Sequence, residues 1–75
     1  MRLSSIKGDS GYKSNVALAR YRVFFNGVEI FDCEIADEER GMIKRIRRVQ
    51  NPLTRQVQTF RKDAEFGEVI IKVKA

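Results

Sequence analysis

Tyr21-Arg22-Val23-Phe24-Phe25-Asn26-Gly27-Val28-Glu29-Ile30 is the stretch that decides the fold of this chain. From Val16 to Phe25 alternate residues form one apolar face, and a period of two predicts a half-buried strand. Asn26-Gly27 is the strongest short-range signal for a two-residue hairpin turn, because both residues accept positive φ angles. The turn predicts three cross-strand pairs, namely Phe25 with Val28, Val23 with Ile30, and Tyr21 with Asp32.

After this hairpin the apolar residues change face. Phe31, Cys33 and Ile35 form the apolar set, with acidic residues between them. A shift of one residue sends side chains to the other side of a sheet, so we expect a bulge or bend near residues 30–32. Phe31 and Cys33 are expected to pack in the core.

Residues 36–50 allow two interpretations. A turn at 36–41 followed by a strand at 42–49 would form a second hairpin. A helix at about 37–50 is the alternative, with Asp37 as N-cap and apolar residues at helical spacing. We favour the strand, because Gly41 inside a helix costs about 1 kcal/mol.

The rest of the chain adds turns and strands. We expect turns at 51–54 and 63–67, a polar strand at 57–62 and a last strand at 69–73. Residues 1–15 are expected to form a flexible or loosely attached leader, either a mobile segment or a short strand around 3–6 followed by a loop. Residues 16–75 would form a single small β-rich domain.

The predicted fold class is mainly β. About five strands with short turns indicate a small antiparallel barrel or rolled sheet. The alternative is an α+β fold with the helix at about 37–50.

Composition argues against most enzyme classes. The 75 residues contain no His and a single cysteine, Cys33. The commonest general base and metal ligand is therefore missing, and an intramolecular disulfide is impossible. The carboxylates of Asp37, Glu38 and Glu39 are expected to be solvated on a turn, unlike catalytic pairs in contrasting environments. We expect no enzymatic activity, no cofactor and no metal.

Charge is sorted into blocks along the chain. Six acidic residues lie between residues 29 and 39, and no acidic residue lies between residues 40 and 62. That second segment holds eight cations: Arg40, Lys44, Arg45, Arg47, Arg48, Arg55, Arg61 and Lys62. Such a block predicts an anionic partner.

The same cations also have a purely structural interpretation. They would pair across the sheet with Glu34 and Glu29, for about 0.2–1 kcal/mol each. No such partner lies near Arg55, Arg61 and Lys62 in the sequence. The expected binding residues are Lys44, Arg45, Arg47, Arg48, Arg55, Arg61 and Lys62. Exposed aromatic residues would favour single-stranded nucleic acid, and Tyr12 and Phe60 are the candidates.

Three segments resemble small β-hairpin proteins encoded by tailed bacteriophages. They are the stretch from Tyr21 through Asn26-Gly27 to Cys33, the turn Ala36-Asp37-Glu38-Glu39-Arg40-Gly41 with the strand after it, and Gly67-Glu68-Val69-Ile70-Ile71. The resemblance covers residues 21–49 and 66–73. It implies a hairpin at 36–49 and a phage setting, and it transfers no functional residue.

From these features we expect a non-enzymatic phage structural or accessory protein. Its strand edges and basic face would dock on a larger protein assembly, a virion or a host complex, or on an acidic protein surface. The alternative is a basic protein that binds nucleic acid through its phosphates. The absence of a long apolar stretch and of a signal sequence predicts no membrane contact and no secretion. The expected location is the cytoplasm of a bacterial host or the virion, and an oligomer is possible.

Overall fold

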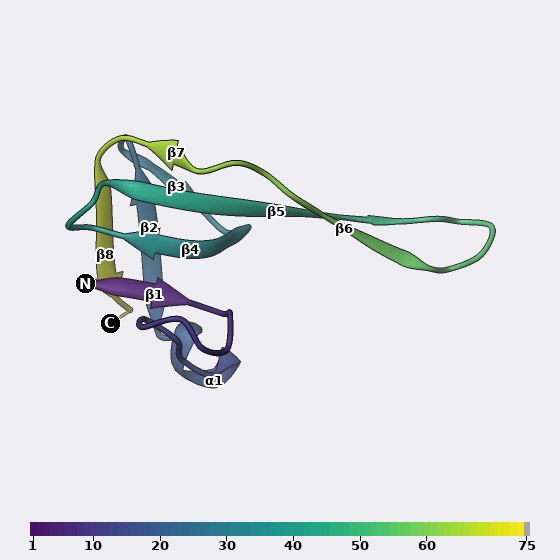
Figure 1. Ribbon diagram of the computed structural model, residues 1–75, viewed down its shortest axis with the longest axis horizontal. Coiled ribbons are helices and arrows are strands. Elements are labelled where there is room, and N and C mark those ends of the chain that lie inside the picture. Colours follow the sequence, from purple (N-terminus) through teal and green to yellow (C-terminus); the bar gives the residue numbers. More distant parts are fainter. Residues whose placement is uncertain (75) are drawn as a thin grey trace.

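The computed structural model describes residues 1–74 and has a mainly β fold, as predicted. Figure 1 shows a body of crossing strands, from which one long hairpin extends. The elements are β1 (Arg2–Ser4), α1 (Asn15–Leu18), β2 (Tyr21–Phe25), β3 (Val28–Ile30), β4 (Cys33–Asp37), β5 (Met42–Gln50), β6 (Val57–Arg61), β7 (Glu65–Phe66) and β8 (Val69–Val73). The favoured strand is present as β5, and the alternative, a helix at about 37–50, is not formed.

Two antiparallel sheets make up the fold. The larger has the order β1-β4-β5-β6, with β7 also paired to β5, and the smaller has the order β3-β2-β8. Strands β2 and β8 run across β1, β4 and β5 in Figure 1. Of the two predicted forms, the rolled sheet is the one present, since neither sheet closes into a barrel within residues 1–74.

The core lies between the two sheets. At its centre is a cluster of four buried residues, in which Ile43 has no exposed surface. Partly buried apolar side chains from β2, β4 and β8 pack against it. The buried cluster consists of Ile30, Ala36, Ile43 and Val69. Because the core is this small, each of its side chains carries a large share of the stability.

The first hairpin has the predicted turn and register. Val23 pairs with Ile30 and Phe25 with Val28, and both turn residues have positive φ angles, 50° at Asn26 and 82° at Gly27. The third expected pair, Tyr21 with Asp32, is wrong, because β3 ends at Ile30. The chain bends at Phe31 and continues as β4 in the other sheet, so the change of apolar face marks a crossover between sheets.

Replacing Gly27 with Val should lower the free energy of unfolding by well over ~1 kcal/mol, because a β-branched residue resists positive φ. A Cβ at Gly27 would meet no atom within 4 Å, so the loss isolates backbone strain from crowding. Urea unfolding would measure it, with Gly27→Asn as the matched control, since Asn tolerates this backbone conformation. Equal stability of the Val variant and the wild type would show that the turn is not formed.

Two local predictions are wrong. Residues 15–18 form a helical turn instead of the start of a strand, because the Ser14 hydroxyl accepts a hydrogen bond from the Ala17 N–H as an N-cap. Phe31 is 87% exposed, because the bend turns it away from the core. The leader prediction left two forms open, and the structure has the short strand, placed at Arg2–Ser4 beside β4.

Candidate functional site: a basic hairpin arm

The long hairpin formed by β5 and β6 projects from the body, and we call residues 46–62 the hairpin arm (Figure 1). The first part of β5 is held in the body, where Met42 pairs with both Asp37 of β4 and Phe66 of β7. From Ile46 to Gln50 it pairs only with β6. Every residue of β6 is exposed. The molecule measures 41 Å along its longest axis against 26 and 24 Å across.

The tip of the hairpin arm is closed by its own hydrogen bonds. The Asn51 N–H donates to the Gln56 carbonyl at 2.9 Å, and the Arg55 N–H donates to the Asn51 carbonyl at 2.7 Å. The Asn51 side-chain oxygen accepts from the Leu53 N–H at 2.9 Å. Arg55 has a φ of 58°, and Leu53 is 92% exposed. The tip therefore presents one apolar and one cationic side chain at the far end of the molecule.

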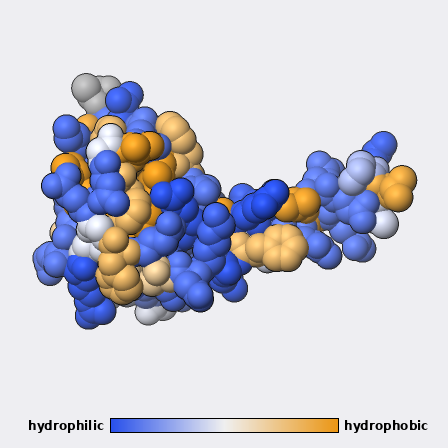
Figure 2. Space-filling view, turned by 90° about the horizontal axis from the view of Figure 1, so that it is seen from above, coloured by the Kyte–Doolittle hydropathy of each residue, from blue (hydrophilic) through white to orange (hydrophobic). Residues whose placement is uncertain are grey.

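Strand register assigns the hairpin arm two faces. Arg48 pairs with Thr59 and Gln50 with Val57, so these four side chains share one face, which we call the polar face. Arg47 pairs with Phe60 and Val49 with Gln58 on the opposite face, which we call the mixed face. Figure 2 shows hydrophilic and hydrophobic side chains mingled along the projecting part. Both faces are open to a partner.

Two of the seven predicted binding cations are engaged within the protein. The Arg45 Nε lies 3.1 Å from the Glu65 Oε2, although the two atoms are not aligned for a hydrogen bond, and its guanidinium lies 5.7 Å from the Phe25 ring centre. The Arg61 Nε donates to the Glu34 Oε1 at 3.2 Å. Glu34 is only 8% exposed, so Arg61 compensates a buried carboxylate. Both residues hold the base of the hairpin arm.

The other five predicted cations are exposed and have no ion-pair partner among residues 1–74. They are Lys44, Arg47, Arg48, Arg55 and Lys62. Of the two carboxylates expected from the sequence to pair with these cations, Glu34 pairs with Arg61, whereas Glu29 pairs with Arg22. Arg61 lacks an acidic partner nearby in the sequence, but the fold brings Glu34 to it across the sheet.

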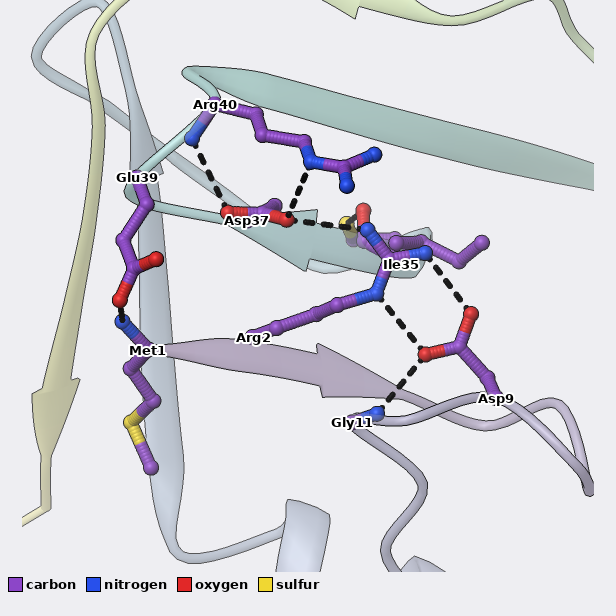
Figure 3. Close-up of polar contacts among 9 residues, drawn as sticks. Met1, Arg2, Asp9, Gly11, Ile35, Asp37, Glu39 and Arg40 are labelled. Carbon is purple, nitrogen blue, oxygen red and sulfur yellow. Dashed lines mark hydrogen bonds and ion pairs between the residues drawn. The ribbon is translucent and has the colours of Figure 1, made fainter.

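The acidic run is used inside the body instead. Arg2 donates to both Asp37 and Asp9, at 3.0 and 2.8 Å, and Figure 3 shows its guanidinium lying between the two carboxylates. The Glu38 Oε2 accepts from the Ile71 N–H at 2.9 Å and so links the two sheets. The prediction that these carboxylates are all solvated is wrong for Asp37, which is buried. Asp37 and Glu38 are therefore engaged within the body, and Glu34 is the member of the acidic run that pairs with the hairpin arm.

These contacts lower the pKa of two carboxyl groups. The pKa of Asp37 falls because the Arg40 backbone N–H donates to it, and Arg2 adds to the effect. The pKa of Asp9 falls because of its hydrogen bonds from the Arg2 side chain and from the Gly11 N–H. Both groups therefore favour the folded state while they are ionised.

The depressed pKa values predict a loss of stability in acid. A lowered folded-state pKa contributes stability above the unfolded value, about 3.9, and that stability is lost as the pH falls below it. The melting temperature should fall between about pH 5 and pH 2, and Arg2→Gln should flatten this fall. Thermal melts across this range test it, with Arg20→Gln as control, since Arg20 is exposed and pairs with no carboxylate in residues 1–74. Parallel profiles of the wild type and Arg2→Gln would contradict it.

A second feature, a cleft of about 390 Å³, lies between the sheets beside α1. Its lining includes Tyr21, Ile30, Phe31 and Cys33. Burial raises the pKa of the Cys33 thiol to about 11, which keeps it protonated at neutral pH. No group of three or more metal-ligating side chains occurs among the described residues. The Cys33 thiol is therefore not activated as a nucleophile in this cleft.

Comparisons with models of protein families, with curated proteins and with solved structures found no match to this chain. No helix within residues 1–74 is long and apolar enough to cross a membrane. Sequence reasoning found the cations of the hairpin arm but missed its projection. The sequence did contain a signal for this projection, because residues 46–62 have no wholly apolar face to bury and no acidic residue.

Proposed function

We propose that the protein is a non-enzymatic nucleic-acid-binding protein that contacts its ligand through the hairpin arm. The observation that carries the proposal is the group of exposed cations without ion partners on and beside a projecting two-stranded ribbon. Between residues 40 and 62 no carboxylate opposes an approaching phosphate backbone. Phosphate contacts of this kind supply most of the affinity in non-specific binding.

The remaining side chains of the hairpin arm fit the same ligand. Amide, hydroxyl and guanidinium groups are those that hydrogen-bond phosphates, sugars and bases. The arm carries Gln50, Asn51, Thr54, Gln56, Gln58 and Thr59 besides its arginines. For this reason we rank nucleic acid above the docking on a protein assembly that the sequence alone favoured.

Docking on a larger protein assembly remains the second candidate. The observation that favours it is the exposed apolar set of the arm, which includes Leu53 at the tip and Phe60 on the mixed face. The outer edge of β6 also pairs with no strand in residues 1–74 and is open to strand addition. The phage setting that the sequence resemblance implies, in a virion or in the bacterial cytoplasm, belongs to both proposals.

A salt titration tests the main proposal. Fluorescence anisotropy would follow binding of the protein to labelled DNA of several unrelated sequences, between about 50 and 200 mM salt. Five phosphate contacts predict a slope of log affinity against log salt of about −4.5, which is a loss of about 500-fold over this range. Absence of binding at the lowest salt concentration, or affinity independent of salt, would overturn the proposal.

A further inference from the structure

We infer that the ligand is duplex DNA and that the hairpin arm lies in its major groove, with the polar face against the base edges. The inference rests on the proposed function and adds the form of nucleic acid, the groove and the reading face. It uses the dimensions of the ribbon, the pairing of its side chains and the position of its cations.

The width of the ribbon selects the groove. Two paired strands lie about 4.8 Å apart, and side chains and backbone atoms add to this on both edges. The major groove of B-DNA is about 12 Å wide and admits a two-stranded ribbon, whereas the minor groove is about 6 Å wide. The hairpin arm has no further strand at its edges within residues 1–74, so nothing widens it.

The polar face carries the groups that distinguish base pairs in that groove. Arg48 and Gln50 are of the residue types that make bidentate contacts to guanine and adenine. The Thr59 hydroxyl lies beside Arg48 and the Val57 methyl groups beside Gln50, and a methyl group suits thymine. At about 3.4 Å per residue the five paired positions span about 17 Å, the rise of about five base pairs.

The cations outside the polar face lie where they would contact the phosphates on the two sides of the groove. Arg47 projects from the mixed face, Arg55 lies at the tip and Lys62 at the base. Cations spread along and around a ribbon meet phosphates on both sides of a groove. A single strand would instead require a stacking platform, and the hairpin arm offers only one aromatic ring, that of Phe60.

The experiment compares three forms of one DNA sequence. A duplex whose major groove is filled by bulky substituents on the pyrimidine C5 position should bind at least about tenfold more weakly than the unmodified duplex. The same duplex saturated with a minor-groove ligand should bind within about twofold of it, and the single strand at least about tenfold more weakly. A weaker effect of the major-groove block than of the minor-groove ligand, or a preference for the single strand, would overturn the inference.

Two triple variants assign the reading face. The first is Arg48→Ala, Gln50→Ala and Thr59→Ala on the polar face. Its matched control on the mixed face is Arg47→Ala, Val49→Ala and Gln58→Ala, which removes the same charge. Only the polar-face variant should lose the tenfold sensitivity to the major-groove block. Equal sensitivity of the two variants would reject the polar face. Failure to bind any nucleic acid would instead reject the proposed function, so the two failures are distinguishable.

Discussion

Replacement of Arg47, Arg48, Arg55 and Lys62 by glutamine is expected to lower the affinity for duplex DNA by about 100-fold or more at about 50 mM salt. Arg47, Arg55 and Lys62 are placed for phosphates and Arg48 for base edges. Because each lost phosphate contact removes about 0.9 from the slope of log affinity against log salt, the slope should fall in magnitude by about three. All four residues are exposed and have no ion partner in residues 1–74. The melting temperature should therefore stay the same or rise as self-repulsion is relieved.

The matched control removes four cations from the body. Lys7, Lys13, Arg20 and Lys74 lie outside the hairpin arm and form no ion pair in the described part of the chain. Their replacement by glutamine changes the net charge by the same amount, so a general loss of positive charge would weaken both variants equally. Equal weakening would contradict a binding surface on the arm. Arg45 is left in place, because it packs over Phe25 and lies beside Glu65.

Replacement of Ile43 by alanine is expected to lower the free energy of unfolding by about 2–5 kcal/mol. Ile43 has no exposed surface and lies in the small cluster between the two sheets, so its removal leaves a cavity that few neighbours can fill. For a domain of this size that loss approaches the whole stability. Urea unfolding followed by circular dichroism would measure it.

The control for this prediction lies on the hairpin arm. Val57 is exposed in β6, so Val57→Ala should change stability by no more than about 0.5 kcal/mol. A similar cost for the two substitutions would place the core elsewhere. Unchanged stability of Val57→Ala would also show that the body folds independently of this side chain on the hairpin arm.

The sequence predicted the parts of the fold that depend on local chemistry. Asn26-Gly27 specified both the turn and the register of β2 and β3, because only residues that accept positive φ form this turn. The strand predicted at 42–49 was also favoured over a helix, since Gly41 fits a turn better than a helix interior; its φ is 60°. The polar strand predicted at 57–62 is present as Val57–Arg61, and the last strand at 69–73 followed from alternation.

Long-range contacts account for what the sequence missed. The single bent strand expected at 28–35 is two strands in different sheets, and no local signal tells a bend from a crossover. The strand predicted from Val16 onward included two alanines at alternate positions, and alanine suits a helix equally well. The Ser14 N-cap favours the helical turn that the structure has there. The burial of Asp37 depends on Arg2, 35 residues away in the sequence.

The candidate site was predicted from the charge of its residues, and strand pairing in the structure corrected which of them are free. The cation-rich segment was found from charge alone. Which of its cations are engaged within the protein followed only from the structure, because Glu34 and Glu65 approach Arg61 and Arg45 through strand pairing across the sheet. The projection itself depends on β4 ending its pairing at Arg45, after which β5 continues with β6 alone.

The separation of the hairpin arm from the core has an evolutionary consequence. Residues 47–60 are all exposed, and none belongs to the core cluster or packs against it. Substitutions there are released from the demands of folding, so that selection on them would act through the nucleic acid that we propose as ligand. The body, by contrast, tolerates little change around Ile43. Such a division would let the side chains of a short ribbon change, and with them the specificity of binding, without loss of stability in the body.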